Sequence, residues 1–255
     1  MKVLVCGKGG SGKSTISTLI AKALQKKGFN VMLIDADESN LGLHRLMGAE
    51  SPTILMDNLG GKKSFKQSLN NTFSDENNSF LKEKITFNEI MGETVSRAND
   101  IKLVAIGKIH ESGEGCACPM GVLSKMILSR LVMGDKDVVI IDSSAGVEHF
   151  GRGVDRECDL ILGVVDPSFD SFLLAEKISK MADNARIDNF FILNKVDDRV
   201  ADLMNANIDQ AKIVAKIPQY DSLFKESLEG KELKTNVSEI ELICELIKTK
   251  KNYYK

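Results

Sequence analysis

The sequence predicts an α/β fold in which a mostly parallel central sheet is flanked by helices on both sides. Short apolar, β-branched runs alternate along the chain with longer segments whose apolar residues recur every three or four positions. Runs that are apolar on both faces are typical of buried parallel strands, and strand–helix–strand alternation implies right-handed crossovers between them. The composition agrees, because 43% hydrophobic and 27% charged residues lie close to the averages of globular domains.

Seven segments have the apolar pattern of a strand, and helical patterns stand between most of them. The expected strands are residues 2–6, 31–35, 102–106, 138–142, 160–165, 190–194 and 212–217. Apolar stripes of two expected helices are formed by Ile16, Leu19, Ile20, Ala23 and Leu24, and by Phe172, Leu173, Ile178 and Met181. Such stripes indicate helices that pack one face against the sheet.

One region departs from this alternation. Residues 60–99 are rich in Lys, Asn, Ser and Glu, and we interpret them as a polar surface insertion with one or two short helices. No stretch resembles a linker, so residues 1–255 are expected to form one domain. Residues 238–250 have a helical pattern that ends in a Lys-rich tail. A core helix is favoured there over a membrane-surface helix, because the apolar stripe is short.

Charge and cysteine content limit the classes of function. Lys plus Arg total 34 against 36 Asp plus Glu, and this net charge of −2 gives no reason to expect a nucleic-acid partner. The longest wholly apolar runs have four residues, against the roughly 20 needed to cross a bilayer, so no stable membrane association is expected. Five Cys, an odd number at low density, do not suggest an oxidised scaffold. We therefore expect a cytoplasmic protein.

Residues 7–14, Gly-Lys-Gly-Gly-Ser-Gly-Lys-Ser, match the phosphate-loop pattern of Gly, four residues and then Gly-Lys-Ser. The pattern stands between a predicted strand and a predicted helix, which is the context that such a loop requires. Glycines let successive backbone N–H groups point at an anion, and the helix N-terminus adds partial positive charge. We expect Lys13 to reach the outer phosphates and the Ser14 hydroxyl to bind Mg²⁺.

Three carboxylates follow predicted strands near this loop. Asp35 and Asp37 follow the second strand, and Asp142 ends another. Ligands of open α/β sheets bind at the carboxyl ends of the strands, where these side chains can hold Mg²⁺ through water. The backbone N–H of Gly146 is expected to meet a γ-phosphate and to move after hydrolysis.

The residues alone leave base recognition open. Asn194-Lys195-Val196-Asp197 follows a predicted strand and matches the guanine-binding motif of many GTPases. In that motif the Asp accepts hydrogen bonds from two guanine donors, and adenine offers no matching pair. The alternative is that Asp197 caps the following helix.

Cys116 and Cys118 form a Cys-x-Cys in a Gly-rich loop ahead of a predicted helix. Two thiolates fall short of the four ligands of a closed tetrahedral site, whereas two copies across a two-fold axis would supply four. Two incidental cysteines are the alternative. Cys6, Cys158 and Cys244 lie in strand or helix patterns and are expected in the core.

The early Lys8 gives the loop a Lys-Gly-Gly-x-Gly-Lys-Ser form, which resembles the deviant Walker A motif of one P-loop NTPase family. That family includes the Min and Par ATPases, the nitrogenase iron protein and nickel-insertion ATPases. Residues 114–119 and 142–153 resemble in particular the CooC-type nickel-insertion ATPases, which serve carbon monoxide dehydrogenase and acetyl-CoA synthase. The resemblance extends to about residue 230 and is weakest in the polar insertion. Ser144 stands where an acidic residue is frequent, and His149 is interpreted as structural or merely exposed rather than as a metal ligand.

The resemblance implies a metallochaperone ATPase that uses ATP, releases ADP and requires Mg²⁺. It implies a homodimer promoted by nucleotide and metal, an apo nickel enzyme as client, and Ni²⁺ or Zn²⁺ at Cys116 and Cys118. It also implies ATP rather than GTP. The implied catalytic residues are Lys8, which would cross the dimer interface, Lys13, and Asp37, which would orient the attacking water. The implied magnesium ligands are Ser14, Asp35, Asp37 and the Walker B acid Asp142. The implied nucleotide contacts are Gly7, Lys8, Gly9, Gly10, Ser11, Gly12, Lys13, Ser14, Thr15, Gly146, Asn194, Lys195 and Pro218.

Three rival activities fit the residues less well. A Min- or Par-type positioning ATPase would need a basic face or a strong terminal amphipathic helix and would leave Cys116 and Cys118 unused. An electron-transfer iron protein carries a cluster cysteine in the region matching residues 142–153, which holds no Cys here. An iron–sulfur scaffold ATPase is usually marked by a Cys-x-x-Cys nearer the C-terminus, and this sequence has none.

Overall fold

An eight-stranded sheet forms the centre of the protein in a computed structural model, which describes residues 1–70, 83–87, 95–110 and 116–253. The order across the sheet is β10-β9-β8-β1-β7-β2-β5-β4, and every neighbouring pair is parallel except β4 with β5. The strands are β1 (Lys2–Gly7), β2 (Asn30–Ala36), β4 (Val95–Ala98), β5 (Ile101–Ala105), β7 (Asp137–Ser143), β8 (Leu160–Val165), β9 (Asp188–Val196) and β10 (Ile213–Pro218). All seven expected strands are present, and their observed ends lie within two residues of the predicted ones.

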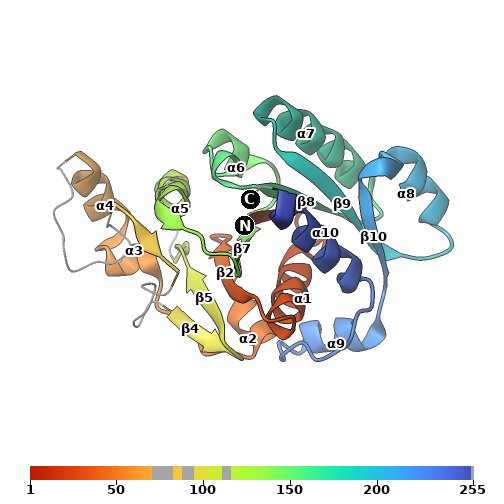
Figure 1. The fold of residues 1–255 in the computed structure, drawn as a ribbon, viewed down its shortest axis with the longest axis horizontal. Helices are drawn as coiled ribbons and strands as arrows, with labels where there is room; N and C mark the ends of the chain where they lie inside the picture. Colours follow the sequence, from red (N-terminus) through yellow and green to blue (C-terminus); the bar gives the residue numbers. More distant parts are fainter. Residues whose placement is uncertain (71–82, 88–94, 111–115, 254–255) are drawn as a thin grey trace.

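Helices cover both faces of the sheet, as Figure 1 shows. The alternating side chains of β1 explain the two layers: Val3 and Val5 join a core with α1 and α10, whereas Leu4 and Cys6 join a second core with α5 and α7. The helices are α1 (Lys13–Lys26), α2 (Leu43–Met47), α3 (Leu55–Asn58), α4 (Gly61–Asn70), α5 (Cys118–Arg130), α6 (Glu148–Gly151), α7 (Phe169–Ala185), α8 (Ala201–Asn207), α9 (Asp221–Leu228) and α10 (Ile240–Tyr253). The predicted fold class is confirmed.

The interpretation of residues 60–99 as a surface insertion was only partly right. The helix α4 is present, but Phe65, Ile85 and Phe87 are buried and belong to the core beneath α5. Two short strands were not predicted: β3 (Ile85–Thr86), which pairs with β6 (Leu131–Val132), and the edge strand β4. A tight turn at Asn99 and Asp100, both with positive φ, lets β4 fold back antiparallel to β5. Residues 71–82 and 88–94 lie outside the described part of this region.

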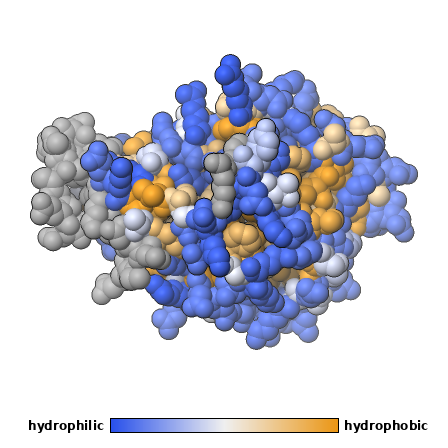
Figure 2. All heavy atoms as spheres, in the orientation of Figure 1, coloured by the Kyte–Doolittle hydropathy of each residue, from blue (hydrophilic) through white to orange (hydrophobic). Residues whose placement is uncertain are grey.

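The last helix is a core helix, as expected. Ile240, Ile243, Cys244 and Ile247 of α10 are buried against the layer that contains α1. Leu173 was wrongly assigned to an apolar stripe, since its side chain is 51% exposed. Within the described ranges, no helix is long and apolar enough to cross a membrane. On the face drawn in Figure 2, apolar residues form separate patches between hydrophilic side chains.

Candidate functional site

The predicted site residues gather where the carboxyl ends of the central strands meet. After β1 the chain continues to β2, on the β7 side of β1, and it later passes from β7 to β8 on the other side, so β1 lies at the topological switch point of the sheet. Ligands of open α/β sheets bind outside the strands at such a point. The loop after β7 is joined to the loop after β1, because the Gly146 N–H donates to the Gly7 carbonyl at 3.1 Å. The γ-phosphate donor predicted at Gly146 is therefore held by the phosphate loop itself in this state.

The phosphate loop has the conformation that its glycines were expected to allow. Gly7 packs so closely on β8 that a Cβ there would lie 2.4 Å from the Val164 carbonyl oxygen, and Gly12 adopts a φ of 101°. Lys13 is buried, and its ammonium group donates to the carbonyl of Lys8 at 3.1 Å. Among the described groups, the buried Ser11 hydroxyl has no hydrogen-bond partner. A buried cation and an unpaired hydroxyl within one turn fit a phosphate group.

Asp142 and Ser14 form the part of the site that fits a divalent cation. The Ser14 hydroxyl donates to Asp142 Oδ2 at 2.6 Å, and the Ser17 hydroxyl donates to Oδ1 at 3.2 Å. Burial raises the pKa of Asp142 to about 6, while the Ser14 hydrogen bond and the Lys13 charge oppose that rise. A serine hydroxyl beside a carboxylate at the phosphate loop is the oxygen donor set that Mg²⁺ prefers.

Asn40 belongs to this cluster and was missed by sequence reasoning. Its amide nitrogen donates to the Ser14 hydroxyl at 3.0 Å and to Asp142 Oδ2 at 3.3 Å, and its amide oxygen accepts from the Gly42 N–H. Nothing local in the sequence marks Asn40, because its two partners are 26 and 102 residues away.

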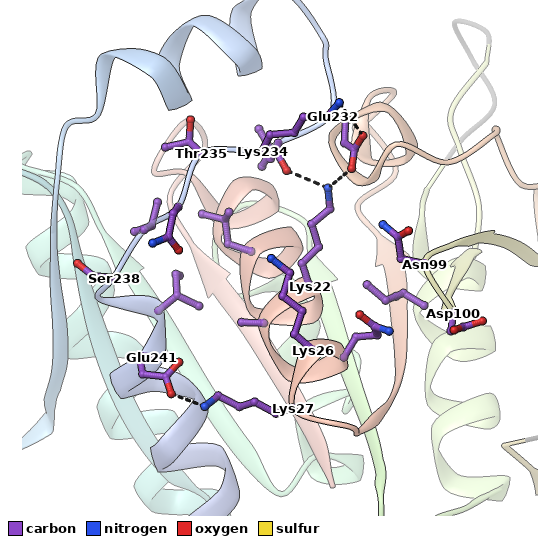
Figure 3. Close-up of a pocket in the computed structure, with 18 residues that line it drawn as sticks. Lys22, Lys26, Lys27, Asn99, Asp100, Glu232, Lys234, Thr235, Ser238 and Glu241 are labelled. Carbon is purple, nitrogen blue, oxygen red and sulfur yellow. Dashed lines mark hydrogen bonds and ion pairs between the residues drawn. The ribbon is translucent and has the colours of Figure 1, made fainter.

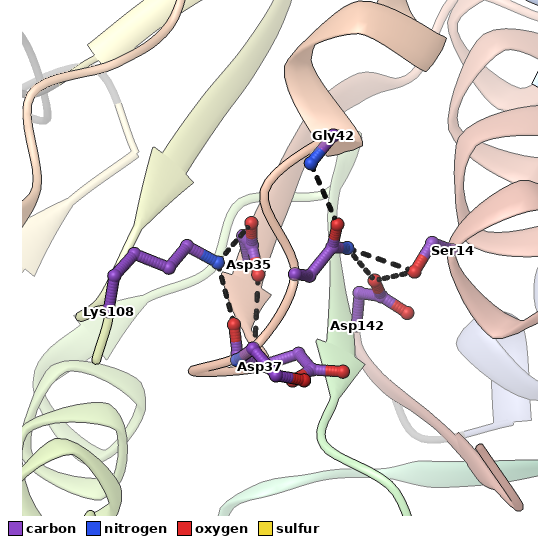
Figure 4. A network of polar contacts seen from close by, with 8 residues as sticks. Ser14, Asp35, Asp37, Gly42, Lys108 and Asp142 are labelled. Atoms are coloured by element: carbon purple, nitrogen blue, oxygen red, sulfur yellow. Dashed lines mark hydrogen bonds and ion pairs between the residues drawn. The ribbon is translucent and has the colours of Figure 1, made fainter. Parts of the chain in front are cut away.

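Asp35, another predicted magnesium ligand, is paired with a buried lysine in this state. Its carboxylate accepts from the Lys108 ammonium at 2.7 Å, and both side chains are only 7% exposed. Lys108 also donates to the backbone carbonyl of Asp37 at 2.6 Å, as Figure 4 shows. Burial raises the pKa of Asp35 to about 7, and the Lys108 charge opposes this rise. Asp35 as a magnesium ligand stays a prediction, and in this state its carboxylate is paired with Lys108.

Asp37 and Lys8 have partners within the chain that sequence reasoning did not specify. One carboxylate oxygen of Asp37 accepts from both the backbone N–H and the hydroxyl of Ser39, at 2.9 and 2.6 Å. The Lys8 ammonium donates to the Ser168 hydroxyl at 3.1 Å, and Ser168 donates in turn to Asp166. Lys8 thus lies beside the loop that follows β8, with an acidic residue one hydrogen bond further on.

The end of β9 contacts the phosphate loop from the side. The amide nitrogen of Asn194 donates to the Ser11 carbonyl, and the Lys195 ammonium donates to the Gly10 carbonyl, each at 2.7 Å. The side chain of Asp197 accepts from the backbone N–H of Arg199 at 2.9 Å and also pairs with its guanidinium group. It does not cap α8, whose N-cap is Val200. Pro218 ends β10 and is exposed.

The two cysteines of the Cys-x-Cys are exposed and joined to each other by a disulfide. Cys118 is the first residue of α5, and its backbone N–H donates to the Cys116 sulfur at 3.0 Å. The cysteine count did not suggest an oxidised scaffold, yet this pair is bonded in this state, and a metal would need the reduced pair. Cys6, Cys158 and Cys244 are buried, as predicted.

Among the described residues of one chain, the cysteine pair has no third metal ligand beside it. Over the described residues, no three His, Cys, Asp or Glu side chains lie together in a way that could hold a metal ion. His149 is buried, and neither ring nitrogen has a hydrogen-bond partner among the described atoms. Burial, with the charges of Arg152 and Lys13, lowers the pKa of His149 to about 3.

A separate cavity of about 950 Å³ lies at the far end of α1 from the phosphate loop. It is lined by the last turns of α1, the β4–β5 turn and the segment before α10 (Figure 3). Lys22 pairs with Glu232 at 2.8 Å, and Lys27 pairs with Glu241. Because these lysines are paired with carboxylates, the cavity has less attraction for an anion than its lysine content suggests.

A phosphate loop at the switch point of a parallel sheet, with a serine–aspartate pair beside its lysine, defines a P-loop nucleotide-binding protein. Comparison with known families makes this class more specific. The model for the CobQ/CobB/MinD/ParA nucleotide binding domain matches residues 2–233, and the chain belongs to this family of ATP-binding proteins.

Curated relatives extend along nearly the whole chain. An uncharacterised ATP-binding protein of Methanocaldococcus jannaschii is 44% identical over 247 residues, which cover 97% of this chain and 99% of that protein. The carbon monoxide dehydrogenase accessory protein CooC of Rhodospirillum rubrum is 31% identical over 229 residues, covering 88% of this chain and 82% of that protein. The resemblance to CooC that the motifs suggested is thus found over most of the chain.

Solved structures confirm the fold. The cell division ATPase MinD of Pyrococcus furiosus superimposes with a TM-score of 0.66 at 16% identity, covering 97% of this chain and 98% of that one. MinD of Pyrococcus horikoshii, solved with Mg-ADP, superimposes with a TM-score of 0.65 at 16% identity, covering 91% of this chain and 86% of that one.

Proposed function

We propose that this protein is an ATPase that binds a metal ion through Cys116 and Cys118 and supports nickel insertion into a carbon monoxide dehydrogenase or acetyl-CoA synthase. The observation that carries the proposal is the position of Cys116 and Cys118. They are exposed, adjacent in space and at the start of α5, whereas the other three cysteines are buried. A relative that is 31% identical is a carbon monoxide dehydrogenase accessory protein, which supports the proposal.

ATP hydrolysis is the proposed reaction at the phosphate loop. Lys13 is already inside the loop and would pair with the outer phosphates in place of the Lys8 carbonyl. Ser14 and Asp142 would hold Mg²⁺, which supplies positive charge to the phosphate oxygens when it is bound. Asp37 would orient the attacking water once its carboxylate leaves Ser39. The Gly146 N–H would exchange the Gly7 carbonyl for a phosphate oxygen.

We infer ATP rather than GTP as the substrate. The carboxylate that would read guanine, Asp197, is bonded to the backbone N–H and the guanidinium of Arg199. Asn194 lies directly against the phosphate loop, with Pro218 at the end of the next strand. A displacement assay in which GTP competes as well as ATP would contradict this choice.

A homodimer would complete the metal site. Each chain supplies two thiols, and a two-fold axis through the cysteine loops would bring four together. Lys8 would then exchange Ser168 for the nucleotide of the partner subunit. No membrane or nucleic-acid partner is part of this proposal, and the expected location remains the cytoplasm.

The test is metal content by mass spectrometry together with sedimentation of the same reduced samples. We expect one ion per dimer and a larger dimer fraction with metal than without it. Cys118→Ala should abolish binding, while the matched control Cys158→Ala, which changes a buried thiol, should not. One ion per monomer, or unchanged binding by Cys118→Ala, would contradict the interface site.

A further inference from the structure

One short stretch at the end of β2, Asp35–Glu38, is connected to the chain on both sides of the cysteine pair. On the N-terminal side, Lys108 bonds to the Asp35 carboxylate and to the Asp37 carbonyl, and the Ile109 N–H donates to the Glu38 carbonyl at 3.2 Å. Cys116 follows only seven residues after Ile109. On the C-terminal side of the pair, the Glu38 side chain is connected to α5 through Arg152.

Arg152 connects that stretch to the helix that begins with Cys118. Its guanidinium lies 3.6 Å from a Glu38 carboxylate oxygen, and the two side chains are 20% and 16% exposed. Its aliphatic stem packs on Gly121 of α5, where a Cβ would lie 2.4 Å from the Arg152 Cδ. Gly121 stands three residues after Cys118, which places the two on neighbouring turns of one helix face.

Arg152 and Glu38 also belong to the two loops that nucleotide would rearrange. Glu38 directly follows Asp37, and Arg152 follows Gly146 by six residues, through the short helix α6. The Gly146 N–H is bonded to the phosphate loop, so a phosphate that takes this N–H must shift the loop that leads to Arg152. Tight packing would transmit the shift, since the cavity between Arg152, His149, Ser144 and α5 measures only about 10 Å³.

We propose that the Arg152–Glu38 pair is the link through which the nucleotide state sets the metal affinity of Cys116 and Cys118. The inference rests on the proposed metal-binding function and adds its regulation. Arg152 is a positioning residue: its stem packs on Gly121 of α5, while its charge is held by Glu38, next to Asp37. An ion pair held largely out of water, as this half-buried one is, is a poor means of stabilisation, because apolar residues of similar volume often do as well. Glu38 even keeps its second oxygen buried without a partner among the described groups.

The experiment measures Zn²⁺ affinity of the reduced protein by competition with a chromophoric chelator, once with ADP and once with a non-hydrolysable ATP analogue. The ratio of the two affinities is the coupling. For the wild type we expect a ratio of about 5-fold or more, within the usual range of allosteric couplings. Arg152→Met should bring the ratio close to 1 while nucleotide-free Zn²⁺ affinity changes less than about 2-fold. Arg152→Lys should restore part of the ratio, which a merely structural side chain would not predict.

Two further variants keep the test decisive if Arg152→Met folds poorly. Glu38→Gln removes the charge of the partner with little change in shape, and Gly121→Ala displaces the Arg152 stem without removing any charge. Both should reduce the ratio. The matched control Gly151→Ala should not, because a Cβ at Gly151 has open space around it. Arg156→Met, on an exposed side chain of the same segment, is the second control.

The outcomes separate the two proposals. A reduced wild-type protein that binds no Zn²⁺ at the cysteine pair would overturn the proposed function. A wild type that binds Zn²⁺ with a ratio of 1, or Arg152 and Glu38 variants that keep the wild-type ratio, would overturn the link and leave the metal site intact. A lowered ratio in Gly151→Ala would also overturn it, because the effect would then not pass through Arg152.

Discussion

Asp142 and Asp35 are register partners on the adjacent strands β7 and β2, yet their surroundings differ. Burial raises the pKa of both carboxyl groups, to about 6 and about 7. Asp142 accepts hydrogen bonds from hydroxyl groups that can leave it, whereas Asp35 is paired with a buried lysine. The position of an aspartate at the end of a parallel strand therefore does not decide whether it can hold a cation. The side chains that meet it from distant segments decide.

The largest effect is expected from a substitution that breaks the pair of Asp35 with Lys108. Lys108→Met leaves a buried carboxylate without its cation and removes a hydrogen bond to the Asp37 carbonyl. Breaking a buried pair in this way costs about 3–5 kcal/mol in the free energy of unfolding, which urea denaturation measures. The double variant Asp35→Asn/Lys108→Met should recover most of that loss. A loss below about 1 kcal/mol for Lys108→Met would show that the pair does not hold this part of the fold.

A substitution of Asp142 should change the rate of ATP hydrolysis rather than the free energy of unfolding. Asp142→Asn keeps the shape of the side chain but removes the charge that would support Mg²⁺ at Ser14. Residues that orient metal ligands typically contribute about 10–100-fold to activity, and we expect a loss of that size in the rate of ATP hydrolysis. The double variant Asp35→Asn/Lys108→Met is the matched control. It should lose much less, and an equal loss would erase the distinction between the two aspartates.

His149, a buried histidine next to β7, should make the free energy of unfolding depend on pH in the direction opposite to that of Asp35 and Asp142. The folded-state pKa of His149 is lowered to about 3, while the unfolded chain titrates near 6.5. Below pH 6.5 the unfolded state takes up a proton that the folded state does not, so the free energy of unfolding falls as pH falls. The carboxyl groups of Asp35 and Asp142, with raised pKa values, act in the other direction.

The contribution of His149 to the pH dependence is therefore measured as the difference between the wild type and a variant without this histidine. Between pH 7 and pH 5 the wild type should lose about 2 kcal/mol more of its unfolding free energy than His149→Leu, which cannot titrate. Denaturant unfolding at both pH values measures this difference. Parallel losses in the two proteins would mean that His149 is protonated in the folded state, against the burial seen here.

The same contrast explains how much could be predicted from the sequence. The phosphate loop, the strand ends and the exposed cysteine pair were found because each depends on neighbouring residues, such as Gly12, Lys13 and Ser14 in one turn. Asp35 and its partner Lys108 are 73 residues apart in the chain, and no local pattern marks their pairing. The edge strand β4 was missed although a local signal for it exists, because the Asn99–Asp100 turn that precedes β5 is a recognisable hairpin signal.

The smallest effect concerns Asn40, which distinguishes the Asp142 cluster from the Asp35 pair most directly. The Asn40 amide occupies both Ser14 and Asp142, the two side chains proposed to hold Mg²⁺. Asn40→Ala should lower the free energy of unfolding of the nucleotide-free protein by about 1 kcal/mol, because it removes these hydrogen bonds. The same variant should need less Mg²⁺ for half-maximal ATP hydrolysis, since the amide no longer competes for the two oxygens.

A lower free energy of unfolding combined with a lower Mg²⁺ requirement makes this last prediction specific to Asn40. The substitution Ser39→Ala, at a neighbouring residue that bonds to Asp37 and contacts neither Ser14 nor Asp142 by hydrogen bond, should leave the Mg²⁺ requirement unchanged. An Asn40→Ala protein that needs more Mg²⁺ would show that the amide helps to bind the ion. In that case Asn40 would join Ser14 and Asp142 as part of the cation site instead of closing it in the nucleotide-free state.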